Sequence, residues 1–248
     1  MQEQPLVSIV SLLYDVKIEY VNKCIDSLLK QTYQNIEIIF VDDCSPNIDY
    51  SYITTLSPKI KLIRNKTNLG FNRNSQKSFE LATGKYVIKV DSDDYIDPTL
   101  IEKEVTFLEN NPEYGAVCCE LQRFGLKKEH ITRPEHWNLY EALFKSMHGY
   151  GYEGGFMFRR ELLKEVSIDP SFRVCTDFDF NLQILERMKV KSIHEILYYY
   201  RSHESNIMKT ANKNNERINT VKRILEKHRR IYRQKHSKPI IKKKNKYF

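Results

Sequence analysis

Residues 86–94, which read YVIKVDSDD, decide the fold that this chain can adopt. The first five residues have the β-branched and aromatic composition of a short strand. That strand ends at an acidic cluster formed by Asp91, Ser92, Asp93 and Asp94. In an open parallel sheet, ligands bind beyond the carboxyl ends of the strands, so an acidic cluster at such an end predicts a binding site.

The sequence upstream of this cluster alternates between the periods of strands and helices. Strand-like runs occur at residues 7–14, 36–41 and 60–64, and segments with one apolar helical face occur at residues 18–31 and 71–82. The run 36–41 also ends in two carboxylates, Asp42 and Asp43. This alternation predicts right-handed βαβ units and therefore an α/β fold, with a mainly parallel sheet flanked by helices.

The second half of the chain is less regular but still mixed. Strands are predicted at residues 115–121, 156–158 and 192–201, and helices at 139–147, 160–166, 178–188 and 214–234. The elements up to residue 201 are compatible with one large α/β domain. The last helix belongs to a tail that is rich in Lys and Arg.

Charge is distributed unevenly along the 248 residues. The formal net charge of +8 combines 40 basic with 32 acidic residues. Residues 213–248 hold 14 of the basic residues and two of the acidic ones, which leaves residues 1–212 with 26 basic and 30 acidic residues, a net charge of −4. A mildly acidic body argues against a nucleic-acid-binding core, which would carry a basic face within the folded domain.

Several other classes of protein are disfavoured. The longest apolar runs are too short to cross a bilayer, and the first residues, MQEQPLVSIV, lack the layout of a signal peptide. Five cysteines occur without a CxxC spacing, which favours reduced thiols and gives no zinc site. We therefore expect a cytoplasmic protein.

The two acidic clusters indicate a bound cation. Carboxylates gathered at one edge of a sheet repel one another, and a divalent cation offsets that repulsion. Carboxylate oxygens suit Mg²⁺ or Mn²⁺, and these ions in turn bind phosphate oxygens. The alternative is that each aspartate only forms a turn or caps a helix.

Short motifs follow one another in a characteristic order. They are VSIV (7–10) with Tyr14, FVDDCS (40–45), NLG (68–70) with Arg73 and Asn74, ATGKY (82–86), DSDD (91–94), GFMFRR (155–160), TDFDF (176–180) and YRSH (200–203). In this order the chain resembles the family 2 glycosyltransferases of GT-A fold, over roughly residues 5–207. The resemblance implies a GT-A domain at residues 1–210, with a nucleotide-binding half (1–110), an acceptor-side half (111–210) and a basic helical tail (211–248).

The resemblance assigns nucleotide-binding roles to residues of the first half. Tyr14 resembles the residue that stacks on the nucleotide base, and Asp43 resembles the carboxylate that reads the base edge, typically of uracil. Arg73 occupies a position near the nucleotide, and Asp91 and Ser92 belong to the DxD motif near the ribose. These roles imply a nucleotide-sugar donor, with a UDP-sugar favoured.

The resemblance assigns metal-binding and catalytic roles in the same way. Asp93 matches the metal-bridging aspartate, with Asp94 beside it, and His203 resembles a residue near the diphosphate or the metal. Asp177 matches the general base, although it lacks the family's usual preceding Glu and Asp179 follows two positions later. The resemblance thus implies Mn²⁺ or Mg²⁺ as cofactor and leaves the choice between Asp177 and Asp179 open.

The chemistry of glycosyl transfer fits these roles. A sugar leaves its nucleoside diphosphate when a Lewis acid stabilises the charge that develops on the β-phosphate. The attacking hydroxyl loses its proton to a carboxylate. One base without a covalent nucleophile implies, on the resemblance, a single displacement with inversion. We expect the acceptor to be a glycan or a lipid-linked saccharide, as in polysaccharide biosynthesis.

Four residues are candidates for the acceptor side, namely Trp137, Gly154, Gly155 and Asp179. The tryptophan lines the acceptor cleft or only packs, and the two glycines allow close approach of a sugar or form a turn. Asp177 has a structural alternative as well, because a carboxylate favours the first turn of a helix.

The tail helix has Ile218, Val221, Leu225 and Tyr232 on one side and many basic residues elsewhere. Such a segment can lie on an anionic membrane surface, which would place the protein peripherally at the inner face of the membrane. The alternative is a helix packed against the domain.

Three other functions compete with glycosyl transfer. An adaptor that binds a membrane or a nucleic acid explains the tail but not the acidic clusters. A phosphotransferase with an aspartate nucleophile would carry its DxD motif at the first strand. A nucleotidyltransferase would have a Gly-rich phosphate loop near that strand.

Overall fold

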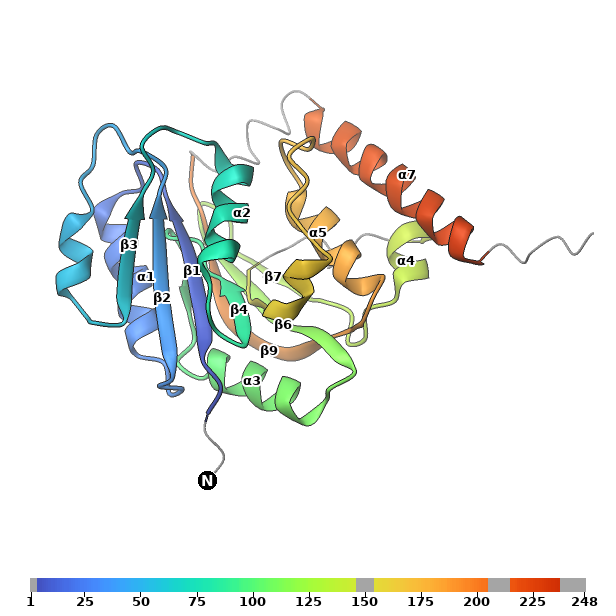
Figure 1. Cartoon of the computed structure of the whole chain (residues 1–248), viewed down its shortest axis with the longest axis horizontal. Coiled ribbons are helices and arrows are strands. Elements are labelled where there is room, and N and C mark those ends of the chain that lie inside the picture. Colours follow the sequence, from blue (N-terminus) through green and yellow to red (C-terminus); the bar gives the residue numbers. More distant parts are fainter. Residues whose placement is uncertain (1–3, 146–153, 205–214, 237–248) are drawn as a thin grey trace, which may run out of the picture.

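The computed structural model describes residues 4–145, 154–204 and 215–236. One continuous sheet runs through it with the strand order β3-β2-β1-β4-β8-β6-β9-β5, and β7 pairs with β6 (Figure 1). This mixed α/β architecture confirms the predicted fold class.

The first half of the sheet is parallel. Its strands are β1 (Val7–Leu13), β2 (Ile36–Asp42), β3 (Ile60–Arg64) and β4 (Tyr86–Lys89), and its helices are α1 (Ile18–Leu29), the short η1 (Ser51–Thr55) and α2 (Phe71–Leu81). β1 pairs in parallel with both β2 and β4, and β2 pairs in parallel with β3. The carboxyl ends of these strands therefore share one edge, as the alternating pattern predicts.

The second half of the sheet is mixed. Its strands are β5 (Tyr95–Ile96), β6 (Tyr114–Gly125), β7 (Glu129–Ile131), β8 (Phe156–Arg159) and β9 (Lys189–Ser202). β6 pairs in parallel with β9 but antiparallel with β7 and β8, and β8 pairs antiparallel with β4. The mainly parallel arrangement is thus a property of the first half.

Helices cover both faces of the sheet. On one face, α1 and α3 (Leu100–Asn110) bury their apolar sides. On the other face lie α2, α4 (Leu139–Phe144), η2 (Arg160–Lys164), α5 (Thr176–Leu185) and α7 (Glu216–His236). The burial of apolar side chains in two layers stabilises the fold and leaves the strand ends to the ligand site.

The predicted tail helix forms, as α7, and packs against the domain. Ile224 is completely buried, and Val221 and Leu225 pack against the same core. The apolar side of the helix is therefore used for packing, while Ile218 stays exposed. Among the described residues, no helix is both long and apolar enough to cross a membrane.

Candidate functional site

The acidic cluster lies at the carboxyl edge of the sheet, in the turn between β4 and β5. The Ser92 hydroxyl is buried and donates to the carbonyl oxygen of Leu12 at 2.6 Å, which ties this turn to the end of β1. The backbone N–H of Asp91 donates to the Tyr198 hydroxyl oxygen at 3.1 Å. The DSDD segment thus connects the end of β1 with Tyr198 of β9.

Asp94 is held inside the protein by β9. Its side chain is completely buried, and its two oxygens accept hydrogen bonds from the Tyr198 hydroxyl at 2.8 Å and from the backbone N–H of Arg201 at 2.6 Å. Burial, followed by repulsion from Asp93 and Asp91, raises the pKa of Asp94 well above its ordinary value. Asp94 therefore anchors the turn against β9.

Asp93 faces outward and contacts His203. The Asp93 Oδ2 and the His203 Nε2 lie 2.7 Å apart, and the two side chains are equally exposed, at 22%. The His203 ring lies 5.8 Å from the ring of Tyr20, and the Arg201 Nε donates to the Asp93 carbonyl oxygen at 2.7 Å. The structure thus brings together the DSDD and YRSH motifs, which are 110 residues apart.

The charged form of Asp93 is unfavourable in this environment. Burial and the neighbouring Asp91 raise the pKa of Asp93, although the hydrogen bond to His203 opposes the shift. Asp91 itself is partly exposed, and its Oδ1 lies 3.1 Å from the Nζ of the buried Lys89. A cation bound at Asp91 and Asp93 would relieve their repulsion.

The donor atoms near this turn fit a hard divalent cation in type. The carboxylates of Asp91 and Asp93 offer oxygens, and His203 offers a ring nitrogen beside them. Within residues 4–145, 154–204 and 215–236, no three His, Cys, Asp or Glu side chains form a ready metal cluster. Such a cation would take its remaining ligands from diphosphate oxygens and water, as Mg²⁺ commonly does.

Asp43 organises the NLG loop at the end of β2. Its buried carboxylate accepts hydrogen bonds from the backbone N–H groups of Leu69 at 2.8 Å and Gly70 at 2.9 Å, and from the Asn65 side chain at 2.8 Å. Gly70 precedes α2 with φ of 79°, a conformation that favours glycine. The FVDDCS and NLG motifs are therefore one structural unit.

Tyr14 and Arg73 lie on the surface at this same edge. Tyr14 directly follows β1 and is 52% exposed. The next residue, Asp15, has φ of 48°, and its side chain accepts hydrogen bonds from Asn47. Arg73 is exposed on the first turn of α2. An exposed aromatic ring and an exposed guanidinium beside the strand ends are available to a ligand.

Asp177 and Asp179 lie in very different environments on α5. Asp177 is partly exposed in the first turn of the helix. Asp179 is completely buried, and it contacts the Lys227 Nζ at 2.8 Å and the His228 Nε2 at 2.9 Å. Burial alone would raise the pKa of Asp179, but the bonds from His228 and Lys227 lower it. Of the two carboxylates, Asp177 is the one that a substrate can reach.

The acceptor candidates Trp137, Gly154 and Gly155 have packing roles. The Trp137 ring is 6% exposed, and its Nε1 donates to the Ser192 hydroxyl at 2.8 Å. A Cβ added to Gly154 would lie 2.8 Å from the Tyr198 ring, and one added to Gly155 would lie 2.5 Å from a buried sulfur in β6. Their acceptor roles stay predictions.

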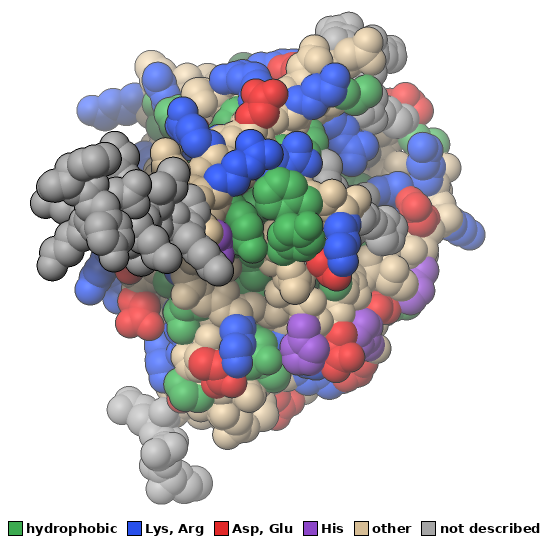
Figure 2. Space-filling view, turned by 90° about the vertical axis from the view of Figure 1, so that its right-hand side faces the viewer, with side chains coloured by type: hydrophobic (Ala, Val, Ile, Leu, Met, Phe, Trp, Pro, Cys, Tyr) green, Lys and Arg blue, Asp and Glu red, His purple; other side chains and the backbone are tan. Residues whose placement is uncertain are grey.

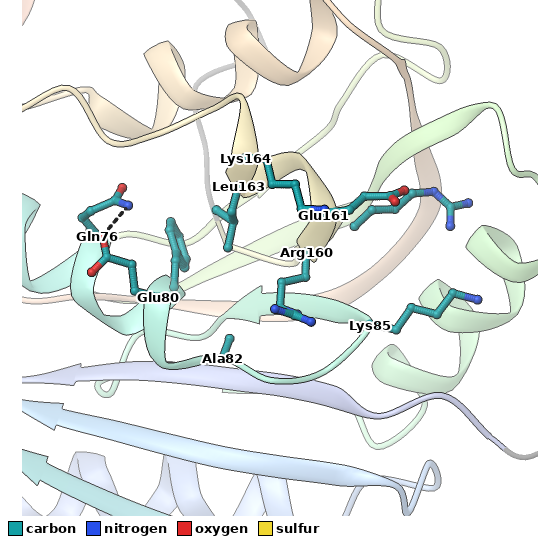
Figure 3. Close-up of a pocket in the computed structure, with 10 residues that line it drawn as sticks. Gln76, Glu80, Ala82, Lys85, Arg160, Glu161, Leu163 and Lys164 are labelled. Carbon is teal, nitrogen blue, oxygen red and sulfur yellow. Dashed lines mark hydrogen bonds between the residues drawn. The ribbon is translucent and has the colours of Figure 1, made fainter.

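A separate cavity of about 630 Å³ lies away from all of these residues. It is lined by the C-terminal part of α2, by Lys85 and by η2, and Arg160 and Lys164 extend along it (Figure 3). None of its lining residues belongs to the acidic cluster or its partners. We therefore place the candidate site at the strand ends.

Sequence reasoning missed the residues that hold the aspartates in place. Tyr198 and Arg201 fix the DSDD turn, and Lys227 and His228 bind Asp179. Only Arg201 lay within a motif, YRSH. The others are separated from their partners by 48 residues or more, so no local pattern points to them.

Comparisons with known proteins find sequences related to this chain. The family model described as "Glycosyl transferase family 2" matches residues 8–167. An uncharacterized glycosyltransferase of Haemophilus influenzae is 38% identical over 120 residues, which cover 47% of this chain and 37% of the relative. The uncharacterized glycosyltransferase EpsJ of Bacillus subtilis is 27% identical over 218 residues, which cover 82% of this chain and 63% of EpsJ. The chain thus spans between about one third and two thirds of these two relatives.

Solved structures share the fold. The crystal structure of S. aureus TarS 1–349 in complex with UDP-GlcNAc has a TM-score of 0.69 at 20% identity, covering 83% of this chain and 61% of that one. The mannosyltransferase PcManGT from Pyrobaculum calidifontis, in complex with GDP-Man and Mn²⁺, has a TM-score of 0.64 at 17% identity, covering 83% and 59%. At such identities the likeness establishes the GT-A fold alone.

Proposed function

Because the chain belongs to glycosyl transferase family 2 and is a glycosyltransferase, we propose that it transfers a sugar from a UDP-sugar to a hydroxyl of a glycan or lipid-linked acceptor. The observation that carries this proposal is the acidic turn at the sheet edge, where Asp93 is half-buried beside Asp91 with a raised pKa and contacts His203. A bound cation would offset the repulsion between these carboxylates, and such a cation also binds the oxygens of a diphosphate.

The metal-binding part of the proposal rests on Asp91, Asp93 and His203. These residues would hold Mn²⁺ or Mg²⁺, which would supply Lewis-acid stabilisation of the leaving diphosphate. We assign Asp94 a supporting role, since β9 already occupies both of its oxygens. Ser92 likewise supports the turn through its bond to β1.

The remaining roles concern the nucleotide and the acceptor. We assign binding of the nucleotide base to Tyr14 and Arg73, and we assign to Asp43 the positioning of the NLG loop beside them. We assign proton removal from the acceptor hydroxyl to Asp177, because it is accessible whereas Asp179 is committed to α7. A single carboxylate base favours direct displacement with inversion.

The division of labour along the chain is part of the same proposal. Residues 1–110 would bind the nucleotide, residues 111–210 would face the acceptor, and residues 211–248 would form a basic extension. A cytoplasmic location at the inner face of the membrane would give such an enzyme access to lipid-linked acceptors.

Thermal unfolding with nucleotides and metal tests the proposal. UDP together with Mn²⁺ should stabilise the protein by about 2.7 kcal/mol at one hundred times the dissociation constant, and GDP or TDP should stabilise it less. Asp93→Asn should abolish the effect, whereas Asp26→Asn, an exposed change on α1, should retain it. Equal stabilisation of both variants would contradict the role of Asp93 in metal binding. A preference for GDP would contradict the assignment of uracil as the nucleotide base.

A further inference from the structure

An aromatic patch lies on the face of the molecule formed by α4 and α7, away from the strand ends. It consists of Tyr140 and Phe144 from α4 and Tyr232 from α7, whose ring centroids lie 5.1, 5.7 and 6.2 Å apart. Tyr140 is 49% exposed, and the other two rings are half-buried. Figure 2 shows hydrophobic side chains gathered near the centre of this face.

Basic side chains border the aromatic patch, and one of them, Lys145, also pairs with Glu141 at 3.3 Å. Arg229 and Arg233 lie over the Phe144 ring, at 5.3 and 5.9 Å, and the Lys145 Nζ lies 6.0 Å from the centre of the Tyr140 ring. α7 as a whole carries eight Lys and Arg residues against two Glu. In Figure 2, Lys and Arg side chains lie above the hydrophobic patch and to one side of it.

We propose that the aromatic patch and its basic rim dock the protein on an anionic lipid bilayer. Tyrosine rings with exposed polar ends favour the interface between water and lipid headgroups. Basic residues are attracted to anionic headgroups, each adding to the affinity. The docking surface is thus the α4–α7 face, to which the apolar side of the tail helix contributes Tyr232, whereas Ile224 and its neighbours on that side pack against the domain.

The same observations disfavour two other occupants. A second copy of this chain would bring two basic rims together, and their repulsion opposes association. A single-stranded nucleic acid would need free ring faces on which its bases could stack. The ring face of Phe144 is already covered by Arg229 and Arg233.

Vesicle co-sedimentation of the full-length protein tests this surface without any sugar donor, so its result is independent of the proposed function. The wild-type protein should bind vesicles of phosphatidylcholine with 30% phosphatidylglycerol, and should not bind phosphatidylcholine alone. The variant Tyr140→Ser/Arg233→Glu should bind about tenfold more weakly, because it removes an interfacial ring and reverses a charge.

Matched controls keep the result interpretable. Leu56→Ser/Lys30→Glu changes an equally exposed apolar residue and a surface lysine elsewhere, and should bind like the wild type. Arg230→Glu/Arg233→Glu leaves the rings intact and should also weaken binding. Unchanged binding of both patch variants would overturn the proposal, as would equal binding to neutral vesicles. Dimerisation, or binding to single-stranded DNA, that is lost in the patch variants would overturn it in favour of those partners.

Discussion

Two groups of aspartates in this protein begin from similar sequence patterns and end in opposite electrostatic environments. In the DSDD turn after β4, burial and mutual repulsion raise the pKa of Asp93 and Asp94. At the start of α5, Asp179 is as deeply buried as Asp94, yet its pKa is lowered by His228 and Lys227. Both groups sit among acidic neighbours in the sequence, DSDD and TDFD.

The difference lies in what the rest of the chain supplies. Asp179 receives two basic side chains from α7, and a second carboxylate, Glu186, accepts from the other nitrogen of His228 at 2.7 Å. Asp94 receives only neutral donors, the Tyr198 hydroxyl and a backbone amide. Burial of a carboxylate therefore does not mark a ligand site by itself; the charge of its partners distinguishes Asp179 from Asp94.

The largest expected effect is the loss of the charge balance around Asp179. Asp179→Ala leaves the buried His228 and the partly exposed Lys227 without their common partner, and breaking one side of a buried ion pair costs about 3–5 kcal/mol. Urea denaturation at pH 7 measures this loss. Asp26→Ala, which removes an exposed partner of Lys30, should change the free energy of unfolding little. Similar values for the two variants would mean that α7 is not anchored through Asp179.

How much of this could be predicted from the sequence depends on the distance between the residues involved. Strands β1, β2 and β4 and the acidic turn that follows β4 can be predicted locally, because each strand is a short apolar run that is buried along nearly its whole length. The separation of Asp177 from Asp179 could not be predicted, since it depends on Lys227, 48 residues away. The location of the tail helix could not be predicted either, because the spacing of apolar residues is the same in a helix that lies on a membrane and in one that packs against a domain.

A smaller effect should depend on pH through His228. Burial would lower the pKa of His228, but its bonds to Asp179 and Glu186 raise it above the ordinary value of 6.5; Lys227, also near Asp179, remains charged throughout this range. A raised histidine pKa contributes stability that is fully present below pH 6.5 and is lost as the pH rises through the folded-state value.

The variant His228→Asn isolates this contribution. It should lose about 2 kcal/mol relative to wild type at pH 6, the order of a hydrogen bond to a charged group, and less at pH 9. Urea denaturation at both pH values measures the two differences. His236→Asn, an exposed change on the same helix, should show no such dependence. A loss for His228→Asn that is constant with pH would mean that the pKa of the imidazole is the same in the folded and the unfolded protein.

The smallest effect is expected for Asp93→Asn, and it should be an increase in stability. This change distinguishes the DSDD aspartates from Asp179 most directly. Asp93→Asn keeps the shape of the side chain and removes a charge that burial and Asp91 disfavour. In the presence of EDTA at pH 7, its free energy of unfolding should therefore rise, by less than the loss expected for Asp179→Ala. A decrease comparable to that of Asp179→Ala would show that Asp93 is a structural carboxylate, because only a residue whose charge the folded chain tolerates poorly gains stability when that charge is removed.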